Sequence, residues 1–351
     1  MKKVIALLLC LVMVLSLCAC GAKTEAPAAE APAAEAPAAE APAAEAPAEV
    51  INYSYCVHST SGWLDETFDL FAETLSELSG GRFVGKAYTG GTMGNEAELT
   101  DAVIMGDLTF SGPADTLVLQ ALGLNDWSPL PGLVDGYDGA FEDLLNTDGY
   151  LAQLLNEQYG AKGLVRLGGM DNGFRCLGTY EPIETVADLK GLKVREASSP
   201  LMVQFYENVG ALPTVVDSSE VMTALEQGTV SGMTNSLVNL VNQGFLGVLP
   251  YVLEINYIYS ARSFLCNADW YNALSAEDQA LVDEAAKVAC DWFNEQAMAD
   301  YEAAVSAAEW TVMQPSEELA AAFKASADKV WEKFAETCDP AVMKVLEDHR
   351  G

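Results

Sequence analysis

The order of the secondary-structure signals at the start of the folded part limits this chain to a few folds. Residues 51–57 alternate between apolar and polar side chains, which predicts a strand. Apolar side chains recur at helical spacing over 64–78, and Gly80 then marks the end of a helix. A second strand is expected over 82–88 and a second helix over 95–105. Strands that alternate with helices favour an α/β fold with a largely parallel sheet.

Two arginines on later strand-like segments are the main candidates for a binding site. Arg175 lies in 173–178 and Arg195 in 192–195. A guanidinium presents a fixed fork of donors that matches a carboxylate at two points. The formal net charge of −33 argues against nucleic-acid binding and makes any anion site depend on local cations. We therefore predict a pocket for a small organic anion, with Asn235, which closes a turn after the arginines, as a polar neighbour.

The loop after the first strand is a further candidate wall of this pocket, because ligands of α/β sheets lie at the carboxyl ends of strands. His58 occupies that position. Simpler interpretations are open for each of these residues. His58 can be a loop residue bonded to the backbone, Asn235 can be a turn residue, and either arginine can belong to the surface or to a structural ion pair.

Several short motifs occur in a fixed order between residues 173 and 235. They read G-x-R, P-I-x-T-x-x-D-L-K-G-L-K-V-R, G-A-x-P and S-E-V-x-x-A-L-E-x-G-x-V-x-G-x-x-N. This order resembles the extracytoplasmic solute-binding proteins of TRAP transporters, of the dicarboxylate-binding (DctP) type, and the likeness continues more weakly outside the stretch. The resemblance implies that Arg195 makes the main salt bridge to a ligand carboxylate, that Arg175 assists it and that Asn235 contacts the ligand. The chain departs from the family at Ser231, where the family has aspartate.

The resemblance also implies a two-lobed, periplasmic-binding-protein-like (type II) α/β fold with discontinuous domains. We expect one lobe from residues 49–172 plus 261–300 and the other from 173–260 plus 301–351, with the ligand between them. The glycine-rich residues 168–172 are predicted to separate two strands and to form one crossing between the lobes.

Later segments complete the expected architecture. A strand-like run over 251–264 predicts the second crossing. Ser275 and Asp278 form a capping-box signal for a helix that continues to about residue 309, and the resemblance implies that this helix spans both lobes. Further helices are expected over 141–159, 316–336 and 341–348, and further strands over 162–167 and 310–313. The serines expected to line the pocket are Ser198, Ser199 and Ser218.

The N-terminal residues have the pattern of a bacterial lipoprotein signal. Residues 1–20 combine two lysines, an apolar run too short to span a bilayer and a final Cys20 after small residues. We expect Cys20 to carry the lipid, so that the protein is extracytoplasmic and tethered to the membrane by its lipid anchor alone. An ordinary secretory signal is the alternative. Residues 21–48 repeat Glu, Ala and Pro, which predicts an extended acidic linker.

The expected partners are a small organic acid and the membrane permease subunits of a TRAP transporter, and we expect a monomer that binds no nucleic acid. No cofactor or metal is expected. Residues 80–86 fit GxxxxGK, but a phosphate loop needs a following helix and Ser or Thr after the lysine, and Ala87 follows here. With only 2 histidines and no CxxC pair, a zinc site is not expected. The odd set of Cys56, Cys176, Cys266, Cys290 and Cys338 argues against a disulfide framework.

Two other functional classes are open at this point. A solute-binding protein of an ABC importer has the same two-lobed plan and differs in the permease on which it docks. A secreted hydrolase is the other alternative, but the chain has no Gly-x-Ser-x-Gly or His-Glu-x-x-His motif and few histidines to act as a base. We therefore expect a binding protein and not an enzyme.

Overall fold

The strands form one ten-stranded sheet of mixed direction. The computed structural model of the protein describes residues 49–58, 63–88, 90–307 and 309–350. The strand order is β2-β1-β3-β9-β4-β7-β5-β6, and β8 pairs with both β4 and β10. The strands are β1 (Ile51–Cys56), β2 (Phe83–Tyr88), β3 (Phe110–Ser111), β4 (Leu164–Thr179), β5 (Lys193–Glu196), β6 (Leu212–Val215), β7 (Gly232–Ser236), β8 (Tyr251–Leu253), β9 (Tyr259–Asn267) and β10 (Thr311–Met313).

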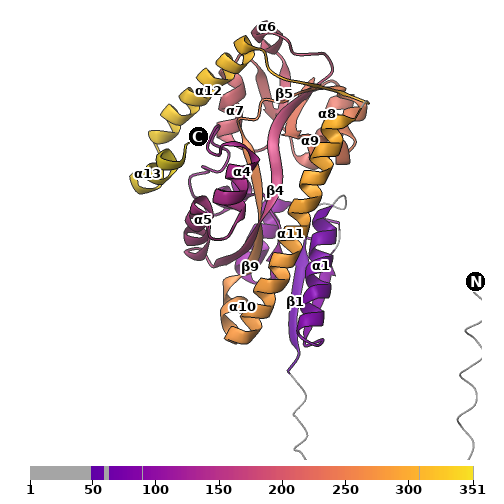
Figure 1. Ribbon diagram of the computed structural model, residues 1–351, viewed down its shortest axis with the longest axis vertical. Helices are drawn as coiled ribbons and strands as arrows, with labels where there is room; N and C mark the ends of the chain where they lie inside the picture. The colour runs from indigo at the N-terminus through magenta and orange to yellow at the C-terminus, as the bar shows by residue number, and fades with distance from the viewer. Residues whose placement is uncertain (1–48, 59–62, 89, 308, 351) are drawn as a thin grey trace, which may run out of the picture. The chain divides into compact units, whose positions relative to one another are not determined.

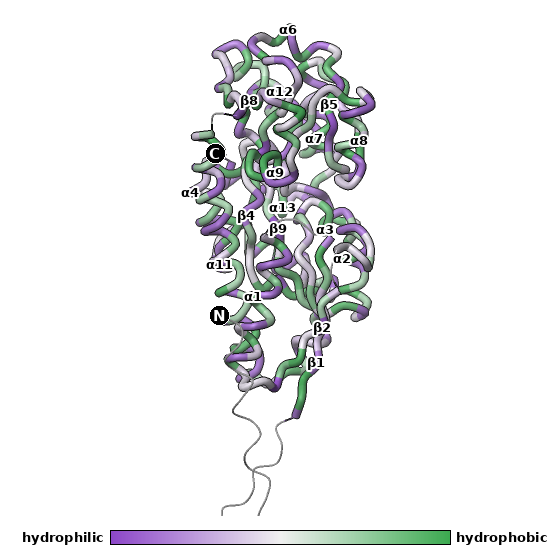
Figure 2. Tube along the Cα trace, turned by 90° about the vertical axis from the view of Figure 1, so that its right-hand side faces the viewer, coloured by the Kyte–Doolittle hydropathy of each residue, from purple (hydrophilic) through white to green (hydrophobic). Residues whose placement is uncertain are grey.

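The direction of the strands changes across the sheet. β1 is parallel to β2 and β3, and β5 is parallel to β6 and β7. Between these two parallel parts, β9 pairs antiparallel with β3 and β4, and β4 pairs antiparallel with β7. The sheet is therefore less uniformly parallel than the sequence predicts. In Figure 2, β4 and β9 run between the elements around β1 and those around β5.

β4 is one continuous strand, so the prediction of two strands separated by residues 168–172 is wrong. The glycines there permit close packing. A Cβ at Gly168 would lie 2.6 Å from Sγ of Cys290, and a Cβ at Gly169 would lie 2.7 Å from the Cα of Leu145. Register shifts between Arg166 and Gly168 and between Asp171 and Phe174 keep β4 paired with β9 across this stretch.

The prediction of one strand over 251–264 is also wrong, because this run contains two strands. β8 ends at Leu253 and β9 begins at Tyr259. Asn256 between them has φ of 52°, a left-handed conformation that asparagine adopts more readily than most residues. That residue turns the chain, and β9 then pairs with β4 from Tyr259 to Asn267.

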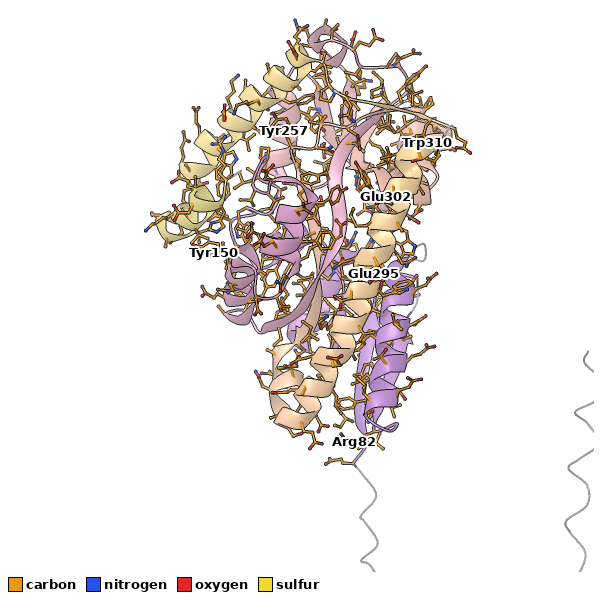
Figure 3. The ribbon with its side chains drawn as sticks, viewed as in Figure 1. Arg82, Tyr150, Tyr257, Glu295, Glu302 and Trp310 are labelled. Atoms are coloured by element: carbon orange, nitrogen blue, oxygen red, sulfur yellow. The ribbon has the colours of Figure 1, made fainter. Side chains whose placement is uncertain are left out.

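The helices cover the sheet, and the longest is α11 (Ala276–Ser306), which runs beside α1 and β4 (Figure 1). As predicted, Ser275 caps α11 by accepting a hydrogen bond from the Asp278 N–H at 3.1 Å. Glu295 and Glu302 lie on its exposed side (Figure 3). The other helices are α1 (Trp63–Leu78), α2 (Glu96–Met105), α3 (Asp115–Ala121), α4 (Gly136–Ala140), α5 (Tyr150–Gly160), α6 (Val186–Leu189), α7 (Pro200–Glu207), α8 (Val221–Glu226), α9 (Leu237–Asn242), α10 (Ala268–Ala273), α12 (Glu317–Ala335) and α13 (Pro340–His349).

The helix expected over 141–159 is interrupted. A π-helical turn over Phe141–Leu145 is followed by a break and then by α5. Asn146 folds back to accept a hydrogen bond from the Asp148 N–H at 3.2 Å, which is the local turn chemistry that competes with a helix. A Cβ at Gly149 would lie 2.4 Å from the carbonyl oxygen of Glu142, so the turn also needs a glycine.

Residues 48–351 form one compact unit with three clusters of buried apolar side chains. Tyr150 at the start of α5 stacks on His349 of α13, with ring centroids 3.7 Å apart (Figure 3). All five cysteines of this unit are buried and free. Within the described residues, no helix has both the length and the apolar character to cross a membrane. Cys20 and the linker lie outside the described residues.

Candidate ligand-binding site

A cavity lies where β4, β5, β7 and β9 meet the loop after β1 and the start of α2. Five of the residues predicted from the sequence line it: His58, Arg175, Arg195, Ser218 and Asn235. An adjoining cleft shares His58, Arg195 and Ser218 with the cavity and adds Ser198. The structure thus brings together side chains that are up to 177 positions apart in the sequence, from His58 to Asn235 (235 − 58 = 177).

Arg195 is a buried cation without a carboxylate partner within the described residues. β5 places it between buried neighbours, and only 6% of it is exposed. Its Nε donates to the backbone oxygen of Val216 at 2.9 Å, and no carboxylate of the described residues lies within 4.0 Å of it. Burial, together with the positive charge of Arg175, lowers the pKa of Arg195 to about 10. At neutral pH Arg195 is therefore charged, and its two terminal nitrogens are available to an anion.

Arg175 is held more firmly by the protein. Its Nη2 donates to the oxygen and Oγ1 of Thr234, both at 2.6 Å, and lies 3.4 Å from Oε2 of Glu196. Thr234 Oγ1 donates in turn to Oε1 of Glu196 at 2.6 Å. Glu196 is completely buried, and burial raises its pKa although Arg175 opposes the shift. Arg175 thus neutralises a buried carboxylate of the protein and also lines the cavity.

Asn235 lies inside β7, so the prediction that it closes a turn is wrong. It stands opposite Cys176 in the β4–β7 ladder, and its Oδ1 accepts a hydrogen bond from the N–H of Ser236 at 2.9 Å. Its Nδ2 has no hydrogen-bond partner among the described residues. That geometry leaves a donor on the cavity wall.

The cavity is also lined by a charged group that sequence reasoning missed. Glu96, in the first turn of α2, pairs with Arg262 of β9, and His58 Nδ1 lies 3.3 Å from its Oε1. Burial alone raises the pKa of Glu96, but Arg262 and His58 outweigh burial and lower it to about 2. Burial lowers the pKa of His58, so the imidazole is neutral at neutral pH and Arg262 is the cation that balances Glu96.

A second missed group is Asp126, which connects to the serines after β5. Ser199 is almost fully buried and does not line the cavity, because its Oγ donates to Oδ2 of Asp126 at 3.1 Å. The side-chain amide of Gln120 links Asp126 to Ser198. Its Nε2 donates to Oδ2 of Asp126 at 2.9 Å and to the backbone oxygen of Ser198 at 2.6 Å. Burial raises the pKa of Asp126 to about 6, although Thr116 and three further side-chain donors oppose the shift.

No metal centre is formed by the described residues, because no three of their His, Cys, Asp or Glu side chains gather at ligating positions. The cavity instead combines arginines, amides and hydroxyls, the donor set that recognises a small anion.

The known proteins that this chain resembles include solute-binding proteins. A solute-binding protein of Verminephrobacter eiseniae is 32% identical over 242 residues, which cover 68% of this chain and 69% of that protein. The C4-dicarboxylate-binding periplasmic protein DctP of Rhodobacter capsulatus is 26% identical over 239 residues, covering 68% of this chain and 71% of that protein. The crystal structure of the sugar acid binding protein DctPAm of Advenella mimigardefordensis, in complex with galactonate, superposes with a TM-score of 0.77 at 22% identity, covering 86% of this chain and 98% of that one.

The last likeness confirms the two-lobed, type II-like α/β fold that the sequence predicts. The sequence model of the family described as "Bacterial extracellular solute-binding protein, family 7" (DctP) matches residues 53–337. That family serves extracytoplasmic solute transport and is not enzymatic. The chain therefore belongs to the DctP family of TRAP transporter solute-binding proteins.

Proposed function

We propose that this protein captures a small organic carboxylate between two lobes and delivers it to the permease subunits of a TRAP transporter. Arg195 is the primary clamp for the carboxylate, Arg175 the second and Asn235 an orienting donor. The observation that carries the proposal is Arg195 itself, a buried charge that lines the cavity and has no carboxylate partner within the described residues. Burying an arginine in this state costs free energy unless an anion arrives to pair with it.

The origin of the cavity residues supports capture by closure. Arg175, Arg195 and Asn235 come from the proposed lobe of residues 173–260 plus 301–351. His58, Glu96 and Arg262 come from the other, residues 49–172 plus 261–300. A ligand that contacts both sets links the lobes. Closure then excludes water, and a hydrogen bond to a charged group is worth about 1.5–3 kcal/mol, against about 0–1 kcal/mol for an ion pair left at the surface.

The same proposal includes the cellular location. Residues 1–20 act as a lipoprotein signal, Cys20 carries the lipid, and residues 21–48 hold the binding unit away from the membrane. The tethered protein works as a monomer, because one copy already supplies both walls of the cavity. Metabolic labelling with a radioactive fatty acid tests the anchor. Label on the wild type but not on a Cys20→Ser variant is expected, and an unlabelled wild type overturns this part of the proposal.

A thermal-shift screen of residues 48–351 against organic acids tests the binding function. An acid at a hundred-fold excess over its Kd stabilises the folded state by about 2.7 kcal/mol. We expect such acids to raise the Tm of the wild type and of Arg82→Ala, a control at a partly buried ion pair that does not line the cavity, but not of Arg195→Ala. An acid that stabilises Arg195→Ala as much as the wild type contradicts the assigned clamp.

A further inference from the structure

We propose that Glu96 makes the cavity selective for a hydroxy acid with one carboxylate and a hydroxyl donor at its far end, and that it disfavours C4-dicarboxylates. The inference rests on the proposed function, in which Arg195 holds the carboxylate. It concerns the part of the cavity lining that Glu96, Arg262 and His58 form.

The balance of charge around the cavity favours a monoanion. Among the described residues, three arginines line it, and two of them already have carboxylate partners. Arg175 pairs with Glu196, and Arg262 pairs with Glu96. Only Arg195 is left to be neutralised, and one carboxylate is enough for that. A second carboxylate would enter a cavity whose remaining cations are already balanced.

Arg262 already balances a carboxylate of the protein, that of Glu96. Its Nη1 is engaged by Glu96 and also lies 3.2 Å from the backbone oxygen of Gly112. Its Nε donates to Oδ1 of Asn172 at 3.3 Å. A dicarboxylate that contacted Arg262 would share this cation with Glu96, so two carboxylates would draw on one positive charge. Like charges placed together in a closed site are strongly unfavourable.

Glu96 offers the ligand an acceptor. The contacts to Arg262, His58 and the N–H of Ala114 all involve Oε1. Oε2 has no hydrogen-bond partner among the described residues. Since the pKa of Glu96 is lowered to about 2, the carboxylate is ionised at neutral pH and can only accept hydrogen bonds. A ligand hydroxyl satisfies Oε2, whereas a ligand carboxylate cannot donate to it.

The space between the two ends suits an extended acid. The cavity and the adjoining cleft are both lined by Arg195 and Glu96, so a carbon chain that starts at Arg195 has a continuous path to Glu96. Glu96 is also close enough to Arg195 for its charge to raise the pKa of that arginine. The two groups therefore address opposite ends of one small molecule.

Calorimetric titration of residues 48–351 with two matched pairs of acids tests the inference. Within each pair the acids differ only by a terminal CH2OH or carboxylate: 4-hydroxybutyrate with succinate, and galactonate with galactarate. For the wild type we expect the hydroxy acid of at least one pair to bind roughly ten-fold more tightly, or better, than its diacid. In Glu96→Gln, Arg262 loses its carboxylate partner. The diacid should then bind more tightly than it binds to the wild type, and the preference for the hydroxy acid should disappear or reverse.

Two further variants separate charge removal from structural damage. Glu96→Asp keeps the charge and should keep the preference for the hydroxy acid. Asp101→Asn removes an exposed charge from the same helix and should behave as the wild type. Equal binding of hydroxy acid and diacid by the wild type, with both lost in Arg195→Ala, overturns the selectivity while the proposed function stands. Binding that does not depend on Arg195 contradicts the proposed function itself, and no binding of any of the four acids rejects the ligand class named here.

Discussion

Nη2 of Arg175 lies 3.4 Å from Oε2 of Glu196, and both side chains are buried. Glu196 directly follows Arg195 in β5, yet its carboxylate pairs with Arg175 of β4, and β7 lies between these two strands. Arg175 and Arg195 therefore differ in kind. Arg175 has a carboxylate partner in the ligand-free protein, whereas Arg195 has none among the described residues and is the clamp that we propose for a ligand.

This difference predicts opposite effects of truncating the two arginines. Arg175→Ala leaves Glu196 as an unpaired buried carboxylate and should lower the free energy of unfolding by about 3–5 kcal/mol. Arg195→Ala removes a buried charge that has no partner among the described residues, so the stability of the ligand-free protein should be unchanged or higher. Urea denaturation of both variants without ligand checks this. Comparable loss in the two variants would show that Arg195 also has a structural partner.

The glycines of β4 predict a packing effect. Gly169→Ala places Cβ 2.7 Å from the Cα of Leu145, a backbone atom that cannot easily move. We expect a loss of about 1–3 kcal/mol in the free energy of unfolding, as for other overpacked cores. Gly160→Ala is the matched control, since nothing lies within 4 Å of its added methyl group. The explanation of the glycine-rich stretch fails if both variants unfold at the same urea concentration.

The buried carboxyl group of Asp126 should make the free energy of unfolding depend on pH. Its pKa in the folded protein is raised from 3.8 to about 6 by burial, so the folded state holds the proton more tightly than the unfolded chain. The stability that this proton supplies is fully present below pH 3.8 and is lost as the pH rises through about 6. The shift corresponds to roughly 3 kcal/mol between these limits.

Asp126→Asn removes this titration and should flatten the curve of unfolding free energy against pH between these two pKa values. His58 has the opposite effect on the change of stability with pH, because burial lowers its pKa. The comparison of Asp126→Asn with the wild type at each pH isolates Asp126, and Asp101→Asn, at an exposed position, is the control. Parallel curves for Asp126→Asn and the wild type would contradict the assigned burial of this carboxylate.

The five buried cysteines predict low thiol reactivity. Burial raises the pKa of Cys290 to about 12 and of Cys338 to about 11, so the reactive thiolate is scarce at neutral pH. Ellman's reagent should modify none of the five thiols of folded residues 48–351 within minutes and all five in denaturant. Fewer than five reactive thiols in denaturant would reveal a disulfide.

Local signals account for the parts of the fold that the sequence predicts well. The Thr185 and Asp188 capping box starts α6, and Ser275 starts α11, because each interaction lies within a single helical turn. The glycines of β4 were misleading for a physical reason. A glycine in a strand has the same local signature whether it opens a loop or admits a neighbouring element, and here the neighbours, Cys290 and Leu145, lie on other elements.

The sequence likewise predicts one part of the candidate site and not the other. The motifs around Arg175 and Arg195 identify one wall, because these residues lie in one short stretch that resembles the family. The other wall depends on a contact between Glu96 and Arg262, which are 166 residues apart. No local pattern distinguishes Glu96 from the other acids that open helices in this acidic chain. Only the fold of β9 against α2 brings the pair together.

The role of Arg195 can be seen directly in a crystal structure of residues 48–351 with an acid identified by the thermal-shift screen. We expect a ligand carboxylate in the cavity, with both oxygens about 2.7–2.9 Å from the guanidinium nitrogens of Arg195. Arg175 should keep its contacts with Glu196 and Thr234 in that complex. A carboxylate bound elsewhere, or an Arg195 that turns to a carboxylate of the protein, would show that Arg195 is not the ligand clamp.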